Sequence, residues 1–156
     1  MSYTDQVGSG VPGVGGGVAV APMESAPFSV MCIDDNVLLV DALERRLNLE
    51  PGFAGLHRVE KLSTVVDDAV RLKPTVVLLD VDLPGGVDAL SILDQFVQRL
   101  PDSRVLVFTG YPTGDLVRRA MSRGAWGFVS KGTTSEILIS AIRRVVAGQA
   151  VIELEE

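Results

Sequence analysis

The chain has 156 residues, enough for one domain of ordinary size and an additional terminal segment. Its 47% hydrophobic content suffices for a core, and its 22% charged content is ordinary for a globular protein. The net charge of −6 argues against a phosphate-backbone binder, which normally needs a basic face. We therefore expect this segment itself to bind no nucleic acid and, because no apolar run approaches the ~18 residues of a span, no membrane.

The beginning of the chain differs in composition from the rest. Gly, Pro and Val dominate residues 1–27, which predicts a flexible leader. Gly8, Gly10 and Gly13 match a dinucleotide-binding pattern, but no predicted strand precedes them and no predicted helix follows. The leader lacks the basic and apolar parts of a secretory signal, and the single Cys32 cannot form an intramolecular disulfide. We expect a cytoplasmic protein.

Short apolar runs after the leader predict strands. Three of them are rich in β-branched residues and apolar throughout, as strands buried on both faces of a parallel sheet are. Two weaker runs complete the set. The predicted strands are residues 30–33, about 56–61, 76–79, 105–108 and 126–129.

Helical periodicity follows each predicted strand. Leu39, Leu43 and Leu47 recur every four residues after the first strand. After the last strand, Thr133 with Glu136 predicts a capping box, and Gly148 predicts the end of the helix. This alternation predicts an α/β fold: a doubly wound five-stranded parallel sheet with five helices and right-handed crossovers.

Polar residues follow four of the predicted strands directly. Because functional sites of such sheets lie beyond the carboxyl ends of the strands, we expect these side chains to converge. Any one of them alone is more often a helix cap, a turn residue or a solvated lysine. Five at successive strand ends are not readily explained by capping. They are Asp34 and Asp35, Asp80, Thr109 with Gly110 behind it, and Lys131.

The residue types at this edge point to phosphate chemistry. Three carboxylates in one pocket repel each other unless a cation lies between them. A hard divalent cation with oxygen ligands fits, and Mg²⁺, or Mn²⁺ in its place, leaves room for water and a phosphate. Lys131 would supply a positive charge to an anion, and the Thr109 hydroxyl would donate to it. We expect phosphoryl transfer, in which positioning and charge neutralisation supply most of the catalysis.

The ordered set Asp34-Asp35, Asp80, Thr109 and Lys131 resembles the receiver domain of two-component response regulators. The resemblance covers residues 28–149 and implies a flavodoxin-like sheet with strand order 2-1-3-4-5. It implies that the domain phosphorylates and dephosphorylates only itself, and is not otherwise an enzyme.

The resemblance also implies roles for residues. Asp80 would be the phosphoacceptor, served by a sensor histidine kinase or a phosphotransfer protein. Asp35 and Asp80 would hold Mg²⁺ directly, Asp34 would act mainly through water, and the backbone carbonyl of Asp82 would complete the metal site. Lys131 would pair with the phosphoryl group.

A conformational switch is implied as well. Thr109 would swing toward the phosphoryl group, Gly110 would leave space beside it, and Phe128 would rotate inward after it. The affected surface would comprise the fourth helix, fifth strand and fifth helix, through which a homodimer can form. Tyr111 and Trp126 are candidate contacts on it, although Trp126 is equally well explained by packing on its own neighbours.

Some residues depart from the family pattern. Gly132 stands where many receivers have Pro. In this respect the sequence is instead similar to receivers that precede a LuxR-type helix-turn-helix. Residues 150–156 are expected to be a short C-terminal tail, with no effector domain in the chain. Leu83, Ala89 and an apparent extra residue predict an unusual path for the loop after Asp80.

Two other functions compete with this interpretation. "VVLLDVDLP" contains the Asp-x-Asp that begins haloacid-dehalogenase-type phosphatases, but their acidic pair follows the nucleophile, whereas Asp34 and Asp35 precede Asp80. The other alternative is a receiver-like protein-interaction module that is never phosphorylated.

Overall fold

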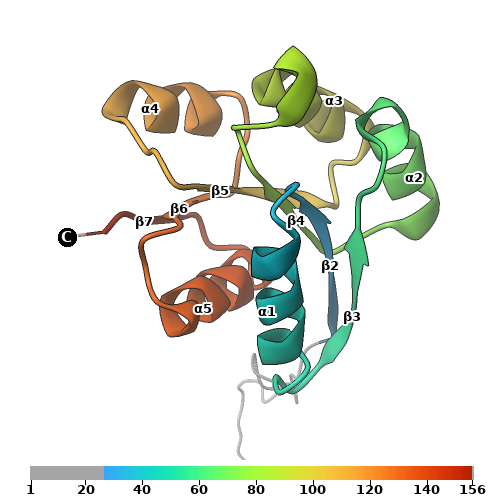
Figure 1. Cartoon of the computed structure of the whole chain (residues 1–156), viewed down its shortest axis with the longest axis vertical. Helices are drawn as coiled ribbons and strands as arrows, with labels where there is room; N and C mark the ends of the chain where they lie inside the picture. The colour runs from blue at the N-terminus through green and yellow to red at the C-terminus, as the bar shows by residue number, and fades with distance from the viewer. Residues whose placement is uncertain (1–26, 156) are drawn as a thin grey trace, which may run out of the picture.

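The computed structural model describes residues 27–155, so the glycine pattern and almost all of the predicted leader lie outside the described residues. Strands and helices alternate, and a six-stranded parallel sheet has the order β3-β2-β4-β5-β6-β7 (Figure 1). The strands are β2 (Phe28–Ile33), β3 (Phe53–Arg58), β4 (Val76–Leu79), β5 (Arg104–Thr109), β6 (Gly127–Ser130) and β7 (Val151–Glu153). The α-helices are α1 (Val37–Leu47), α2 (Val65–Leu72), α3 (Ala89–Arg99), α4 (Gly114–Ser122) and α5 (Ser135–Val146), with 3₁₀ turns η2 (Leu62–Thr64) and η3 (Pro84–Gly86).

The predicted class and the five α-helices are confirmed, but the predicted number of strands is wrong. A sixth strand, β7, runs parallel to β6, with Val151 opposite Gly127. It lies within residues 150–156, which were expected to be only a tail. The strand is three residues long and only Val151 of it is buried, so no apolar run marks it in the sequence.

Two predicted strands are displaced along the chain. The strand expected at about 56–61 is β3, which begins at Phe53. It is an edge strand with several exposed positions, so its apolar signal is weak. Phe53 is anchored by the ring of Phe28, with ring centroids 5.7 Å apart. The strand expected at 126–129 is β6, one residue later.

Helices cover both faces of the sheet. One hydrophobic cluster joins the sheet to α1 and α5, and the other joins it to α2, α3 and α4 (Figure 1). Cys32 belongs to the first cluster, and burial, with the nearby charge of Asp34, raises the pKa of its thiol to about 12. In residues 27–155, no helix is long and apolar enough to cross a membrane.

The ends of α5 are set by local hydrogen bonds. Its cap is Thr134, whose hydroxyl accepts from Ile137 N at 3.2 Å, so the predicted cap at Thr133 is wrong by one residue. Thr133 is engaged elsewhere, since its hydroxyl donates to Ser130 O at 2.8 Å. Gly148 follows the helix with a φ of +88°, a conformation that favours glycine, and the predicted end is confirmed.

Candidate functional site

The parallel strands β2 and β4 lie side by side at the point where the strand order changes direction, β3 lying on one side of β2 and β4 on the other. Asp34 and Asp35 follow β2, and Asp80 follows the neighbouring β4. One carboxylate oxygen from each lies within 4.8 Å of the others. The structure thus brings together the three carboxylates that the sequence predicted to converge.

Asp34 and Asp35 differ in their surroundings. Asp34 Oδ1 accepts a hydrogen bond from Asn36 N at 2.9 Å, and this bond closes the turn that leads into α1. Asn36 itself is the cap of α1, since its side chain accepts from Leu39 N at 3.1 Å. Asp34 Oδ2 is buried and receives no aligned hydrogen bond, although the Lys131 ammonium lies 2.7 Å away. Asp35 is exposed, although one of its carboxylate oxygens lies close to those of Asp34 and Asp80.

Asp80 is almost fully buried, with 3% of the residue exposed. Its side chain is 4% exposed, and that of Asp34 is 2% exposed. Its Oδ1 accepts from Asp82 N at 3.1 Å, and its Oδ2 lies 3.3 Å from Lys131 Nζ. Burial raises the pKa of Asp80, and the charge of Asp34 adds to this. The hydrogen bond from the Asp82 N–H and the charge of Lys131 lower the pKa but do not cancel the effect of burial. The ionised form of Asp80 is therefore disfavoured in this pocket.

Lys131 bridges two of the carboxylates. Burial lowers its pKa, but the close ion pair with Asp34 and the charge of Asp80 outweigh burial, and the pKa is raised overall. The side chain therefore stays an ammonium at neutral pH. Its backbone N–H donates to Thr109 O at 2.8 Å, which ties the lysine to the end of β5. The ion pair between Lys131 and Asp34 was not predicted from the sequence. The placement of opposite charges at the same edge of the sheet could have indicated it.

The donor set suits a hard divalent cation. All three side chains offer carboxylate oxygens, and the buried Asp34 Oδ2 lacks an aligned donor. Within the described residues, the positive charge facing this group is the Lys131 ammonium. The arrangement fits Mg²⁺, which prefers oxygen ligands and retains waters.

Thr109 is fully buried and turned toward the loop after β4. Its hydroxyl donates to Asp82 Oδ2 at 3.4 Å and accepts from Tyr111 N at 3.3 Å. A Cβ added to Gly110 would meet nothing within 4 Å, so there is open space at this position. Phe128 is fully buried in the cluster formed with α2, α3 and α4.

The loop after Asp80 contains the 3₁₀ turn η3, which was not predicted. Gly85 and Gly86 have φ values of +72° and +68°, a region that favours glycine. Asp88 then caps α3 by accepting from Leu90 N at 3.1 Å. The sequence "PGG" was the signal for this turn.

The two candidate interface residues have different surroundings. Tyr111 is 79% exposed at the end of β5. Trp126 is half-buried, packs against the cluster formed with α1 and α5, and lies under the Arg104 guanidinium, 4.5 Å from its ring centroid. Trp126 thus packs on its own neighbours.

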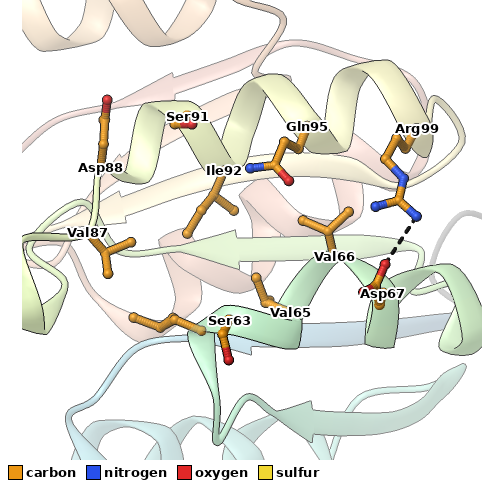
Figure 2. A pocket seen from close by; sticks show the side chains of 11 residues that line it. Ser63, Val65, Val66, Asp67, Val87, Asp88, Ser91, Ile92, Gln95 and Arg99 are labelled. Carbon is orange, nitrogen blue, oxygen red and sulfur yellow. Dashed lines mark hydrogen bonds and ion pairs between the residues drawn. The ribbon is translucent and has the colours of Figure 1, made fainter.

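A pocket of about 440 Å³ opens elsewhere, between α2 and α3. Figure 2 shows its apolar side chains, among them Val65, Val66 and Ile92, and the Asp67–Arg99 ion pair of 3.2 Å at one end. None of the residues at the carboxylate edge lines it. This pocket is therefore separate from the candidate site at the strand ends.

A doubly wound parallel sheet with an acidic pocket, a lysine and a buried threonine at its carboxyl edge is suited to binding a cation and an anion side by side. Residues 30–143 match the family model of the response regulator receiver domain. The chain belongs to this family, and the predicted resemblance is confirmed. Receiver domains are signalling domains of two-component systems.

Individual relatives agree with this family. The chain is 32% identical over 125 residues to the response regulator GacA of Pseudomonas aeruginosa, covering 80% of this chain and 58% of that protein. A LuxR-family response regulator from Aurantimonas sp. SI85-9A1 has a TM-score of 0.74 at 23% identity, with 81% and 89% of the chains covered. A Burkholderia pseudomallei response regulator with a phosphorylated aspartic acid, calcium ion and citrate has a TM-score of 0.66 at 25% identity, with 78% and 69% covered.

The chain spans about half the length of the curated relatives that it matches, 52% and 58% in two of them. The match to receivers also leaves the haloacid-dehalogenase alternative without support, because one family model accounts for both Asp34-Asp35 and Asp80.

Proposed function

We propose that Asp80 accepts a phosphoryl group from a phosphohistidine of a sensor histidine kinase or phosphotransfer protein. The observation that carries this assignment is the setting of Asp80. Its carboxylate is almost fully buried, lies 3.3 Å from the Lys131 ammonium, and shares a pocket with Asp34 and Asp35. Asp35 is exposed, whereas the side chains of Asp80 and Asp34 are both shielded from water.

In the transfer, an Asp80 oxygen forms a bond to phosphorus while the bond from phosphorus to the imidazole nitrogen breaks. The imidazole leaves, and an acyl phosphate remains on Asp80. Lys131, already within reach of Asp80, neutralises charge on the phosphoryl oxygens. The Thr109 hydroxyl leaves Asp82 and donates to a phosphoryl oxygen.

We assign a Mg²⁺ site to the same pocket. Asp35 and Asp80 would be direct ligands, Asp34 would act through water, and the backbone carbonyl of Asp82 would complete the set; Mn²⁺ would serve as well. When bound, the cation neutralises charge on the transferred group. Support comes from the oxygen donor set and from the buried Asp34 Oδ2, which has no aligned donor.

The switch would pass from Thr109 to Phe128. We propose that Phe128 exchanges between its buried position and an exposed one as Thr109 changes its hydrogen-bond partner. The surface so altered comprises α4, β6 and α5. We assign to this surface a homodimer that includes Tyr111, which is exposed beside it.

The test is direct phosphorylation. The chain is incubated with Mg²⁺ and phosphoramidate, and its intact mass is measured; we expect one added phosphoryl group. Asp80→Asn should remove it completely, whereas Asp102→Asn, which removes an exposed carboxylate outside the site, should retain it. A folded protein that gains no phosphoryl mass with saturating donor would instead favour the protein-interaction module.

A further inference from the structure

The chain turns back along β6 after α5. Val151 N donates to Trp126 O at 3.0 Å, and the Val151 side chain is only 1% exposed. Glu153 pairs with Arg144 of α5 at 3.0 Å. We call residues 151–155 the C-terminal strap. It covers the edge of β6 that would otherwise be the edge of the sheet (Figure 1).

The end of the strap contacts the loop between β6 and α5. Glu155 Oε1 lies 3.3 Å from the hydroxyl of the buried Ser130, which also accepts from Gly132 N at 3.1 Å. A Cβ on Gly132 would overlap the Glu155 carboxylate. The φ of Gly132 is not in the left-handed region, so the backbone does not require glycine there. The missing side chain instead provides the space that Glu155 occupies.

The same loop carries the lysine of the acidic site. Lys131 lies between Ser130 and Gly132, and its ammonium reaches Asp80 at 3.3 Å. Its backbone N–H is held by Thr109 O at 2.8 Å. The loop therefore contacts the phosphoacceptor and the switch threonine on one side and the strap on the other. Asp80 is thus connected to the strap through its ion pair with Lys131, the backbone of the loop, and the hydrogen bond from Ser130 to Glu155.

We propose that docking of the C-terminal strap and phosphorylation of Asp80 oppose each other, so that phosphorylation releases the strap. The inference rests on the proposed function of Asp80. The phosphoryl group carries about 1.5 to 2 negative charges in place of the single charge of ionised Asp80, and it draws Lys131 toward itself, which shifts the loop. The strap carries Glu153 and Glu155, which the added charge repels. Release would expose the unpaired backbone groups of β6, which can pair with another strand.

The first experiment follows hydrogen exchange of the full chain, with and without Mg²⁺ and phosphoramidate, in peptides that contain residues 151–155. We expect exchange there to accelerate about fivefold or more on phosphorylation, the scale of common coupling energies. Fluorescence of Trp126, the single tryptophan, reports the same event. Asp80→Asn treated identically should show no change.

The outcomes separate the two proposals. A phosphoryl mass with unchanged exchange in the strap would overturn the coupling alone. Absence of the phosphoryl mass would overturn the proposed function, and the coupling with it.

The second experiment measures the reciprocal effect. Because coupling is reciprocal, loosening the strap should tighten binding of beryllofluoride with Mg²⁺, a phosphoryl mimic, by about the same fivefold factor. Glu155→Ala and Gly132→Ala should each tighten beryllofluoride binding. The double variant should bind little more tightly than either single variant, since both substitutions disrupt the same contact between the strap and the loop. Asp102→Ala removes the same charge from an exposed position at the opposite end of the sheet and is the matched control. Equal affinity in wild type and Glu155→Ala would contradict the proposal.

Discussion

At the scale of single residues, the site combines groups that oppose one another. Asp80 is nearly buried beside Asp34, and its raised pKa shows that its ionised form is disfavoured in the native state. The Lys131 ammonium offsets part of the electrostatic cost of ionising Asp80, because it forms ion pairs with both Asp80 and Asp34. The proposed phosphoacceptor oxygen would thus be held at the expense of stability, as groups at functional sites often are.

This imbalance predicts the effect of Asp80→Asn on stability without divalent metal. The raised native pKa means that the native state binds the Asp80 proton more tightly than the unfolded chain does, so its contribution to stability falls as pH rises. At neutral pH the amide removes this cost, and we expect stability to rise by about 1 kcal/mol. Urea unfolding in EDTA measures it. The exposed Asp102→Asn should change stability by less than about 0.5 kcal/mol, and a destabilised Asp80→Asn would refute the argument.

The sequence predicted the site residues better than their mutual contacts. Asp34, Asp80 and Lys131 were found because each directly follows an apolar strand and parallel strands end at a common edge. The hydrogen bond from Thr109 to Asp82 was not found, since it depends on the turn after β4. Contacts between loop side chains depend on rotamers that a strand pattern does not determine.

At the scale of elements, α5 is joined to the end of α1 by a buried arginine. Arg143 is 8% exposed and donates to Glu50 Oε1 at 2.8 Å and to Pro51 O at 2.8 Å. Its guanidinium also lies 5.3 Å from the centroid of the Phe28 ring. Arg46 donates to Glu50 Oε2 at 2.6 Å, so one carboxylate binds two guanidinium groups.

We expect Glu50→Ala to destabilise the protein by about 3 kcal/mol, because it leaves Arg143 buried without this carboxylate. The effect should depend on pH. Hydrogen bonds from Arg46 and Arg143 lower the pKa of Glu50. Its contribution is therefore complete above the unfolded carboxyl pKa of about 4.3 and is lost as pH falls through the lower native value.

Urea unfolding of wild type and Glu50→Ala from about pH 7 to about pH 3 measures this difference. The exposed Glu60→Ala is the control and should match wild type at every pH. A difference between wild type and Glu50→Ala that stays constant down to the lowest pH would contradict the assignment.

The elements that the sequence predicted well are those with a strong apolar signal. β4 has the predicted bounds because all its residues are buried. The bounds of β3 were predicted too late in the chain, because none of its residues is fully buried and no apolar run marks where this edge strand begins and ends. β7 was missed because its pairing comes from the open edge of β6 and the fit of Val151, which are tertiary features.

At the scale of the whole molecule, the proposed metal site would link metal binding to folding. Only the native state brings the three carboxylates together, so Mg²⁺ should raise the melting temperature. At about 100 times the dissociation constant, the stabilisation should be about 2.7 kcal/mol. Differential scanning calorimetry over a Mg²⁺ series measures it.

Asp35→Asn provides the sharper variant, because Asp35 is exposed and its loss should disturb the fold little. It should abolish most of the Mg²⁺ effect, whereas the exposed Asp102→Asn should keep it. A melting temperature that does not respond to Mg²⁺ in the wild type would argue against the metal site.

The chain has a single cysteine, and it lies in the core with a thiol pKa of about 12. Alkylating reagents attack the thiolate, so Cys32 should remain unlabelled in the folded protein. The native sequence is therefore already suitable for site-specific labelling. Ile152→Cys, at a half-exposed position of β7, would accept a maleimide dye or spin label without prior removal of Cys32.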